Sequence, residues 1–303
     1  MAVLIVCALV ACSEQTPPSL STRVPSDTPI SLQAPSPKPT DIDPKAMDEA
    51  LLHALVDLRN KFRCNGVSGC PAHDILVGFR RHAWKPLREL FPLAPAKAPY
   101  RSRIVRIVAE LELDEARPWL RKLLVDDSDK ARGFAVYGLA LLGDSRDLTM
   151  LRQFADAPGI IASAMTRTAA AWGLAIAGHD RGPKRFAAIL KEAAEHQLGG
   201  ATLRWGLELC QRPGSPSCDG ILATAAGHPS YIVRRQVLRN VGAPWTDGEL
   251  QALGVLVADP NPNLARRARA QLQRIKGGQA LDSPSAWRQW LKSKETNPDK
   301  RAP

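Results

Sequence analysis

The stretch AVYGLALLGD at residues 135–144 returns as AAWGLAIAGH at residues 170–179. Its centre, an aromatic residue followed by Gly and Leu, begins at Tyr137, Trp172 and Trp205, at intervals of 35 and 33 residues. A period of this length is typical of stacked helix pairs, none of which can bury its apolar face alone. The repeat therefore predicts an all-α fold, an α-solenoid of stacked antiparallel helix pairs.

Each repeat divides into two helices. In the first, Ala, Leu and the aromatic residue follow a three- and four-residue spacing that predicts a buried stripe. The glycine inside that helix costs about 1 kcal/mol relative to alanine, and close approach of a neighbouring helix would offset it. Gly143 and Gly178 stand where glycine ends a helix. The second helices carry their own apolar residues, which are Leu148, Leu151 and Phe154 in one repeat and Phe186, Ile189 and Leu190 in the next.

The segment DPNPNLARRA at residues 259–268 resembles the start of a HEAT repeat. That family places Asp, often with Pro, in the turn before a helix that carries Arg, and Asp127 and Arg132 fit the same pattern. The resemblance covers residues 99–275 and implies that Arg132, Arg266 and Arg267 join Asp–Arg pairs between units. It indicates a fold and not a function, because HEAT arrays serve many ends.

Residues 2–11 form an uncharged, mostly apolar run that suits the core of a secretory signal. It is too short to span a bilayer, which takes about 20 residues. Its end, Leu9-Val10-Ala11-Cys12, resembles the lipobox of bacterial lipoproteins. The resemblance implies that the chain is cleaved before Cys12 and that Cys12 carries a lipid with fatty acyl chains such as palmitate. Ser13 after the cysteine implies the outer membrane. No Lys or Arg precedes Cys12, so the alternatives are a chance apolar start or a true start upstream of Met1.

The chain divides by composition. After a signal peptide at residues 1–11, residues 12–45 read as a disordered tether, because residues 13–45 hold eight of the 25 prolines and ten Ser or Thr. Such a segment cannot bury enough apolar surface to offset its ordering entropy. Residues 46–98 are expected to form a helical capping unit, residues 99–281 the HEAT-like repeats, and residues 282–303 a C-terminal capping helix and tail. Ser283 would cap that helix, and Trp287 and Trp290 would cover the last repeat.

Residues 46–303 carry 38 Lys and Arg against 26 Asp and Glu, and so basic a surface attracts anionic partners. In HEAT arrays the second helix of each pair usually lines the concave side. We therefore expect a basic inner face on the second helices, made by Arg117, Arg121, Lys122, Arg152, Lys184, Arg185 and Lys191. Ordinary solvated helix surface is the alternative, as is recognition by the arginine-rich first helices around Arg234 and Arg267.

Apart from Cys7 in the signal peptide and the lipidation candidate Cys12, four cysteines remain, namely Cys64, Cys70, Cys210 and Cys218. Neither pair has the two-residue gap of a zinc knuckle or a thioredoxin-like motif. For an exported protein the simplest reading is two local disulfides, Cys64–Cys70 and Cys210–Cys218. Four unpaired thiols are the alternative, since spacing does not fix connectivity.

No catalytic motif stands out. The six histidines are scattered, and His179 with Asp180 falls where the previous repeat has a turn at Asp144. Metal spacings, nucleophile elbows and phosphate-binding glycine loops are missing from the sequence. We expect no catalytic residue, metal or cofactor.

These observations predict a monomeric, lipid-anchored envelope scaffold that binds a protein or an anionic envelope component, held to the membrane by its lipid and without a nucleic-acid partner. The alternatives are a lyase-like HEAT enzyme and an envelope polymer-binding protein. A HEAT-type DNA glycosylase needs nucleic acid, which conflicts with export.

Overall fold

The computed structural model describes residues 44–60, 70–95, 98–159, 162–196, 199–242, 245–277 and 283–295. Over these ranges the chain is all-α, with no strand. Residues 43–303 form one compact unit. None of the described helices combines the length and the apolar character that a bilayer crossing requires. The predicted signal peptide, Cys12 and nearly all of the predicted tether lie outside the described residues.

Three helices lie in the range of the predicted N-terminal unit. They are α1 (Pro44–Arg59), α2 (Pro71–Gly78) and α3 (Arg81–Leu90). Helix α1 begins two residues before the predicted start of the N-terminal unit at residue 46, because proline is tolerated in a first turn, where its missing N–H would have no partner. Cys70 caps α2, with its Sγ accepting from the His73 N–H at 3.4 Å. Trp84 packs edge-on against Trp119 at 5.5 Å, which joins this unit to the repeats.

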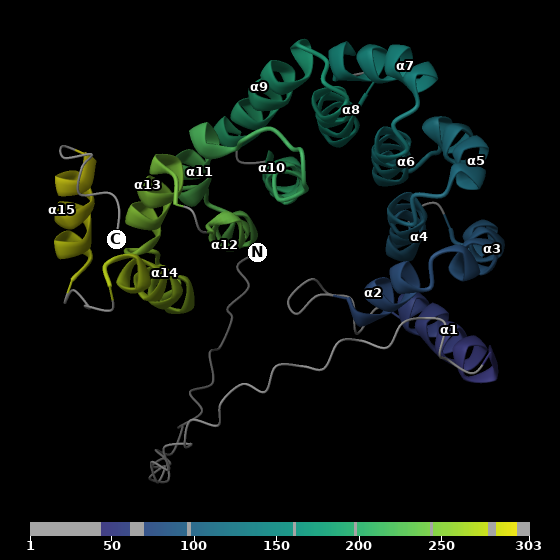
Figure 1. Cartoon of the computed structure of the whole chain (residues 1–303), viewed down its shortest axis with the longest axis horizontal. Coiled ribbons are helices and arrows are strands. Elements are labelled where there is room, and N and C mark those ends of the chain that lie inside the picture. The colour runs from purple at the N-terminus through teal and green to yellow at the C-terminus, as the bar shows by residue number, and fades with distance from the viewer. Residues whose placement is uncertain are drawn as a thin grey trace, which may run out of the picture. The chain divides into compact units, whose positions relative to one another are not determined.

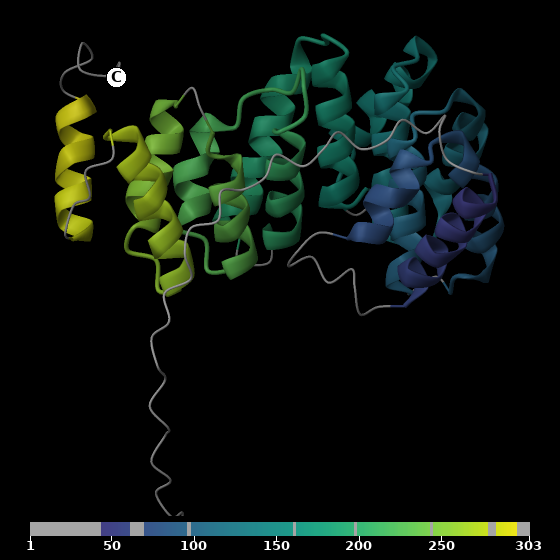
Figure 2. The same ribbon diagram turned by 60° about the horizontal axis from the view of Figure 1, so that its bottom comes forward.

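Eleven further helices form two layers within the unit (Figure 1). The first layer consists of α4 (Pro99–Glu110), α6 (Asp129–Leu141), α8 (Ala164–Ile176), α10 (Gly200–Leu209), α12 (Tyr231–Asn240) and α14 (Pro262–Ile275). The second layer consists of α5 (Arg117–Lys122), α7 (Ser145–Asp156), α9 (Arg181–Glu195), α11 (Asp219–Ala226) and α13 (Asp247–Leu256). Figure 2 shows these helices standing side by side along their length. This arrangement confirms the solenoid.

Glycines bring the first-layer helices unusually close together. A Cβ on Gly138 would stand 2.8 Å from the Ala109 Cβ, and one on Gly173 would stand 2.5 Å from the Ala140 Cβ. These contacts join α4 to α6 and α6 to α8, as the sequence predicted for a glycine inside a helix. Gly143 and Gly178 end their helices with φ of +63° and +73°, a conformation that glycine adopts without strain.

The repeated aromatic residues form the centre of the core. Tyr137, Trp172 and Trp205 are all at least 98% buried, as their phase predicted. The Tyr137 ring lies 5.4 Å from Trp172 and 5.2 Å from Trp205, and Phe134 meets Trp205 edge-on at 5.1 Å. Because each aromatic pair adds about 0.5–1.5 kcal/mol beyond area burial, this cluster ties α6, α8 and α10 together.

Two Asp–Arg pairs of identical design hold successive units in register. Arg101 donates to Asp126 at 2.6 Å and to the Ala94 carbonyl at 2.7 Å. Arg234 donates to Asp259 at 2.7 Å and to the Pro229 carbonyl at 2.8 Å. In each case the arginine of a first helix spans from the loop before that helix to the Asp that follows the second helix.

The predicted partners of this motif need correction. Asp259 pairs with Arg234 of the preceding first helix and with neither Arg266 nor Arg267, because its Oδ1 also accepts the Asn261 N–H at 2.7 Å and so faces the turn. Arg266 donates to Asn263 at 2.9 Å. Arg132 does join an acidic partner, Asp129, within its own helix.

The Cys210–Cys218 disulfide is confirmed, with the two Cα atoms 6.1 Å apart. It closes the loop between α10 and α11. Within that loop the Ser215 hydroxyl accepts from the Trp172 indole N–H at 2.8 Å and donates to the Leu209 carbonyl at 2.7 Å. The loop is thereby fastened to the aromatic core. Cys64 lies outside the described residues, so the Cys64–Cys70 bridge stays a prediction.

The last helix, α15 (Pro284–Glu295), packs on α13 and ends the array. The Ser283 hydroxyl accepts from the Ala286 N–H at 3.2 Å, which is the predicted N-cap. Trp287 is buried and Trp290 half-buried, with their rings 5.8 Å apart. Both tryptophans cover the last repeat, as expected.

Candidate functional site

The predicted partner-binding cations belong to α5, α7 and α9, which are second-layer helices. Figure 1 shows the row of helices in this unit curving toward the first layer, so the first layer lines its inner side. The expected inner position of the second helices is therefore wrong. The physical reason is the close glycine and alanine packing within the first layer, which shortens that side of the row.

Two of these cations are paired with acidic side chains, and one of the two, Arg121, is exposed. Arg117 is buried and donates to Asp147 at 2.6 Å and to Asp114 at 2.8 Å. Arg121 donates to the other oxygen of Asp147 at 2.7 Å. Because Asp147 stands on α7, these arginines join one unit to the next.

The other five predicted cations lie at or near the surface of the second layer. Arg185 is half-buried and donates to the Ala155 carbonyl at 2.9 Å. The exposed members are Lys122, Arg152, Lys184 and Lys191. Their binding role stays a prediction, on the outer side of the row.

A cluster of ion pairs surrounds Glu110, at the end of α4. One of its oxygens accepts from His73 Nε2 at 2.9 Å, and the other meets Arg106 at 3.1 Å and Arg212 at 3.0 Å. Arg106 also pairs with Glu208 of α10. We call these five residues the ionic clasp. It joins helices that are separated by two intervening first-layer helices.

The ionic clasp rests on the aromatic core. The Arg106 guanidinium lies 5.3 Å from the Trp205 ring, and the Arg212 guanidinium lies 5.6 Å from the Tyr137 ring. The attraction between a guanidinium group and an aromatic ring stabilises the cation, and it is stronger where water is excluded. Burial raises the pKa of Tyr137, and the Glu110 charge raises it further, so the phenol stays protonated.

The chemistry of the ionic clasp suits a structural role. Burial alone would raise the pKa of Glu110, but His73, Arg106 and Arg212 together lower it to about 2. A general base works best with a pKa near the operating pH. Both Glu110 oxygens are already occupied, so this carboxylate is a weak proton acceptor, although histidine and glutamate often serve in catalysis.

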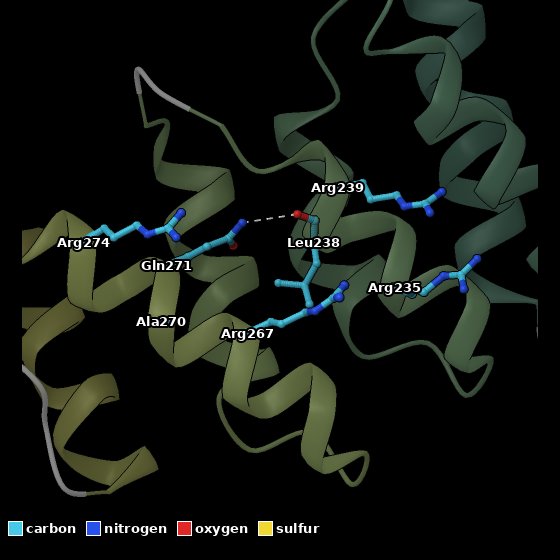
Figure 3. A pocket seen from close by; sticks show the side chains of 7 residues that line it. All are labelled: Arg235, Leu238, Arg239, Arg267, Ala270, Gln271 and Arg274. Carbon is cyan, nitrogen blue, oxygen red and sulfur yellow. Dashed lines mark hydrogen bonds between the residues drawn. The ribbon is translucent and has the colours of Figure 1, made fainter. Parts of the chain in front are cut away.

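A different arrangement occurs between α12 and α14. Four arginines line one depression of about 210 Å³, and we call them the arginine groove; they are Arg235, Arg239, Arg267 and Arg274. Figure 3 shows two coming from each helix. Leu238 and Ala270 form the apolar floor. Gln271 donates its amide to the Leu238 carbonyl at 3.5 Å, which joins the two helices beneath the groove.

Helical spacing explains why these side chains share one face. Arg235 and Arg239 are four residues apart, and Arg267 and Arg274 are seven apart, so each pair recurs on the same side of its helix. Arg239, Arg267 and Arg274 are exposed and have no carboxylate partner among the described residues. The lining of the groove contains no acidic side chain.

The positive field extends beyond the groove to α10. Burial lowers the pKa of Arg204; Glu208 opposes this, whereas the charges of Arg106, Arg235 and Arg239 lower the pKa further. Arg204 therefore lies within electrostatic reach of both arginines of α12. A concentration of like charges that lacks an acidic lining is costly unless an anion or solvent screens it.

Part of this site was visible in the sequence. The sequence predicts the arginine-rich first helices around Arg234 and Arg267 as the alternative recognition surface. Arg267 does line the groove, whereas Arg234 is buried against Asp259. The missed signal is a repeat, since Arg204, Arg235 and Arg267 recur at intervals of 31 and 32 residues. An arginine at the same or the neighbouring helix position in each of three units predicts a row of charges across stacked helices.

Among the described residues, no group of three or more His, Cys, Asp or Glu side chains is placed to hold a metal ion. Comparison with protein-family models, with curated proteins and with solved structures found no match for this chain.

Proposed function

We propose that this protein is a lipid-anchored, HEAT-like scaffold of the bacterial envelope that binds an anionic partner through the arginine groove. The observation that carries the proposal is the grouping of four arginines around one depression with no acidic lining. Elsewhere the inter-unit arginines Arg101, Arg117 and Arg234 each face a carboxylate. Arg239, Arg267 and Arg274 have no such carboxylate among the described residues, so the pairing that stabilises the fold does not explain them.

Guanidinium groups suit such a role. Each presents a planar fork of donors that matches carboxylate or phosphate oxygens, stays charged at any physiological pH and is less strongly hydrated than an ammonium group. The groove also lies on two first-layer helices joined through Gln271, so its charges stand on rigid elements. A preorganised surface loses less conformational entropy on binding.

Two observations support an envelope location. The sequence Leu9-Val10-Ala11-Cys12 resembles a lipobox, and a Pro-, Ser- and Thr-rich segment follows it. The Cys210–Cys218 disulfide suits an oxidising compartment. Labelling with a palmitate analogue should mark the wild-type protein and not Cys12→Ser; equal labelling would contradict the anchor.

Binding is tested with fluorescent polyglutamate and polyphosphate, titrated with the full chain at low and at physiological salt. The groove variant changes all four groove arginines to Ser. A matched control removes four exposed cations of the second layer instead; it is Lys122→Ser, Arg152→Ser, Lys184→Ser and Lys191→Ser. We expect the groove variant to weaken binding at least tenfold and the control variant less than threefold. The difference in affinity between the two variants should become smaller as the salt concentration rises. Equal losses in the two variants would refute the groove as the binding surface.

A further inference from the structure

We propose that the arginine groove is part of a longer track across α10, α12 and α14 that takes a linear phosphate polymer in preference to a single compact anion. This inference rests on the proposed function and names its ligand class. Three properties of the described residues lead to it, namely the spacing of the charges, their continuation onto α10 and the composition of the lining.

The charges are spread out and do not converge. Figure 3 shows the four guanidinium groups ending at separate points over the two helices. A four-residue step along a helix is about 6 Å and a seven-residue step about 10 Å, and neighbouring helix axes lie about 8–10 Å apart. One phosphate or carboxylate is too small to touch all four groups, whereas a chain of anionic groups can contact them in turn.

The row of charges continues in one direction. Arg204 and Arg235 occupy equivalent positions, each four residues after the first residue of its helix, and Arg267 lies one position further along α14. The charges of Arg235 and Arg239 both lower the pKa of Arg204. Arg106, whose charge also lowers the pKa of Arg204, is already paired with Glu208 and Glu110. The track therefore runs from Arg274 to Arg204 and ends where the ionic clasp begins.

The lining favours phosphate over other polyanions. Its uncharged residues are Leu238, Ala270 and Gln271, and it contains no aromatic side chain. Single-stranded nucleic acids are usually held by bases stacked on aromatic rings, so the groove lacks that means of recognition. Each phosphate within a chain exposes two unesterified oxygens on either side of the backbone, which can accept from arginines of both helices. A side-chain carboxylate projects from its peptide and reaches one side.

The test is a chain-length series measured on the full-length protein. The probes are orthophosphate, triphosphate and short and long polyphosphate, with polyglutamate of matched charge as the comparison. We expect no saturable binding of orthophosphate, weak binding of triphosphate, and an affinity that rises at least tenfold to a plateau once the polymer spans the track. In the groove variant, the slope of log K against log salt should become shallower by about 2–3, at about 0.7 per lost phosphate contact.

A single substitution tests the extension onto α10. Arg204→Ser should weaken binding of long polyphosphate about three- to tenfold and leave triphosphate binding unchanged, because the short ligand is held between α12 and α14. The second-layer control variant described above should behave as wild type in both assays. Circular dichroism and melting temperature confirm that every variant is folded.

The outcomes separate the two proposals. If no polyanion binds, or if all binding survives in the groove variant, both proposals fail. If orthophosphate binds as tightly as the long polymer, the track is wrong and the anion-binding groove stands. If polyglutamate binds more tightly than polyphosphate of matched charge, or if Arg204→Ser has no effect on the long polymer, the corresponding part of the track is overturned.

Discussion

Two parts of this solenoid are rich in arginine and use it in opposite ways. Between α4 and α10, Arg106 and Arg212 converge on Glu110 and form an internal clasp. Between α12 and α14, Arg239, Arg267 and Arg274 face a shallow groove without a carboxylate partner in the described chain. The residue type is the same, so what an arginine contributes depends on whether the opposing helix supplies an acidic side chain.

Adjacent residues on one helix show the same contrast. Arg234 is buried against Asp259, in the turn between α13 and α14, whereas Arg235 lines the groove. A step of one residue turns a helical side chain by about a quarter of the circumference. The comparison makes a clear prediction: removing a paired charge costs stability, and removing a groove charge costs binding.

The largest loss of stability is expected for Glu110→Ala. It leaves Arg106, Arg212 and His73 without their shared carboxylate at a site where the Glu110 side chain is 9% exposed. Breaking a buried ion pair from one side costs on the order of 3–5 kcal/mol, and urea unfolding would measure it. Glu195→Ala, at an exposed position of α9, should stay within about 0.5 kcal/mol of wild type. A loss below 1 kcal/mol for Glu110→Ala would contradict the buried clasp.

A somewhat smaller loss is expected for Arg234→Ala, about 3 kcal/mol, because it leaves the buried Asp259 carboxylate without its cation. The matched variant is Arg239→Ala, on the same helix and exposed, which should change the free energy of unfolding by less than about 0.5 kcal/mol. Similar values for the two variants would remove the distinction between paired and groove arginines.

The pH dependence of stability should identify the clasp directly. The folded-state pKa of Glu110 is about 2 against an ordinary value of 4.5, so its contribution is complete above about pH 4.5 and is lost as the pH falls toward 2. We expect about 2 kcal/mol of the acid-induced loss to come from this group. In Glu110→Gln that part of the slope between pH 4.5 and 2 should disappear. An unchanged slope would mean that other carboxylates carry it.

The smallest effect on stability is expected for the groove variant. Removing four like charges from a groove whose lining has no acidic side chain relieves the repulsion between them, so the melting temperature of this variant should equal or slightly exceed that of wild type at low salt. Added salt screens the repulsion and should bring the two melting curves together. A strongly destabilised groove variant would show that these arginines are structural after all.

The repeat was readable from the sequence because its determinants are local. Gly138 and Gly173 recur with the aromatic residues, and both their helical phase and their close packing follow from that pattern. The Cys210–Cys218 loop and the Ser283 cap were equally local, since each lies within a few residues of its partner.

The ionic clasp could not be read in this way. Arg106 and Glu208 are 102 residues apart, and their contact depends on how strongly the row curves. Curvature is a sum of small rotations between helices, and the repeat period does not fix those rotations. The curvature of the row also determines which layer lies on its inner side, and the prediction that the second helices line that side was wrong. The recurrence of Arg204, Arg235 and Arg267 at intervals of 31 and 32 residues was present in the sequence, but only the structure shows which face they occupy.

The ionic clasp also limits where this protein can gain or lose repeats in the course of evolution. In most solenoids each unit contacts only its neighbours, so a duplicated unit is accommodated anywhere along the array. Here Arg106 and Glu208 connect non-adjacent units, and an extra helix pair between them would pull the two ends apart. A duplication after α12 meets no such closure and would add one more arginine to the row. Growth of this array by unequal recombination is therefore permitted at its C-terminal end and opposed in its N-terminal half.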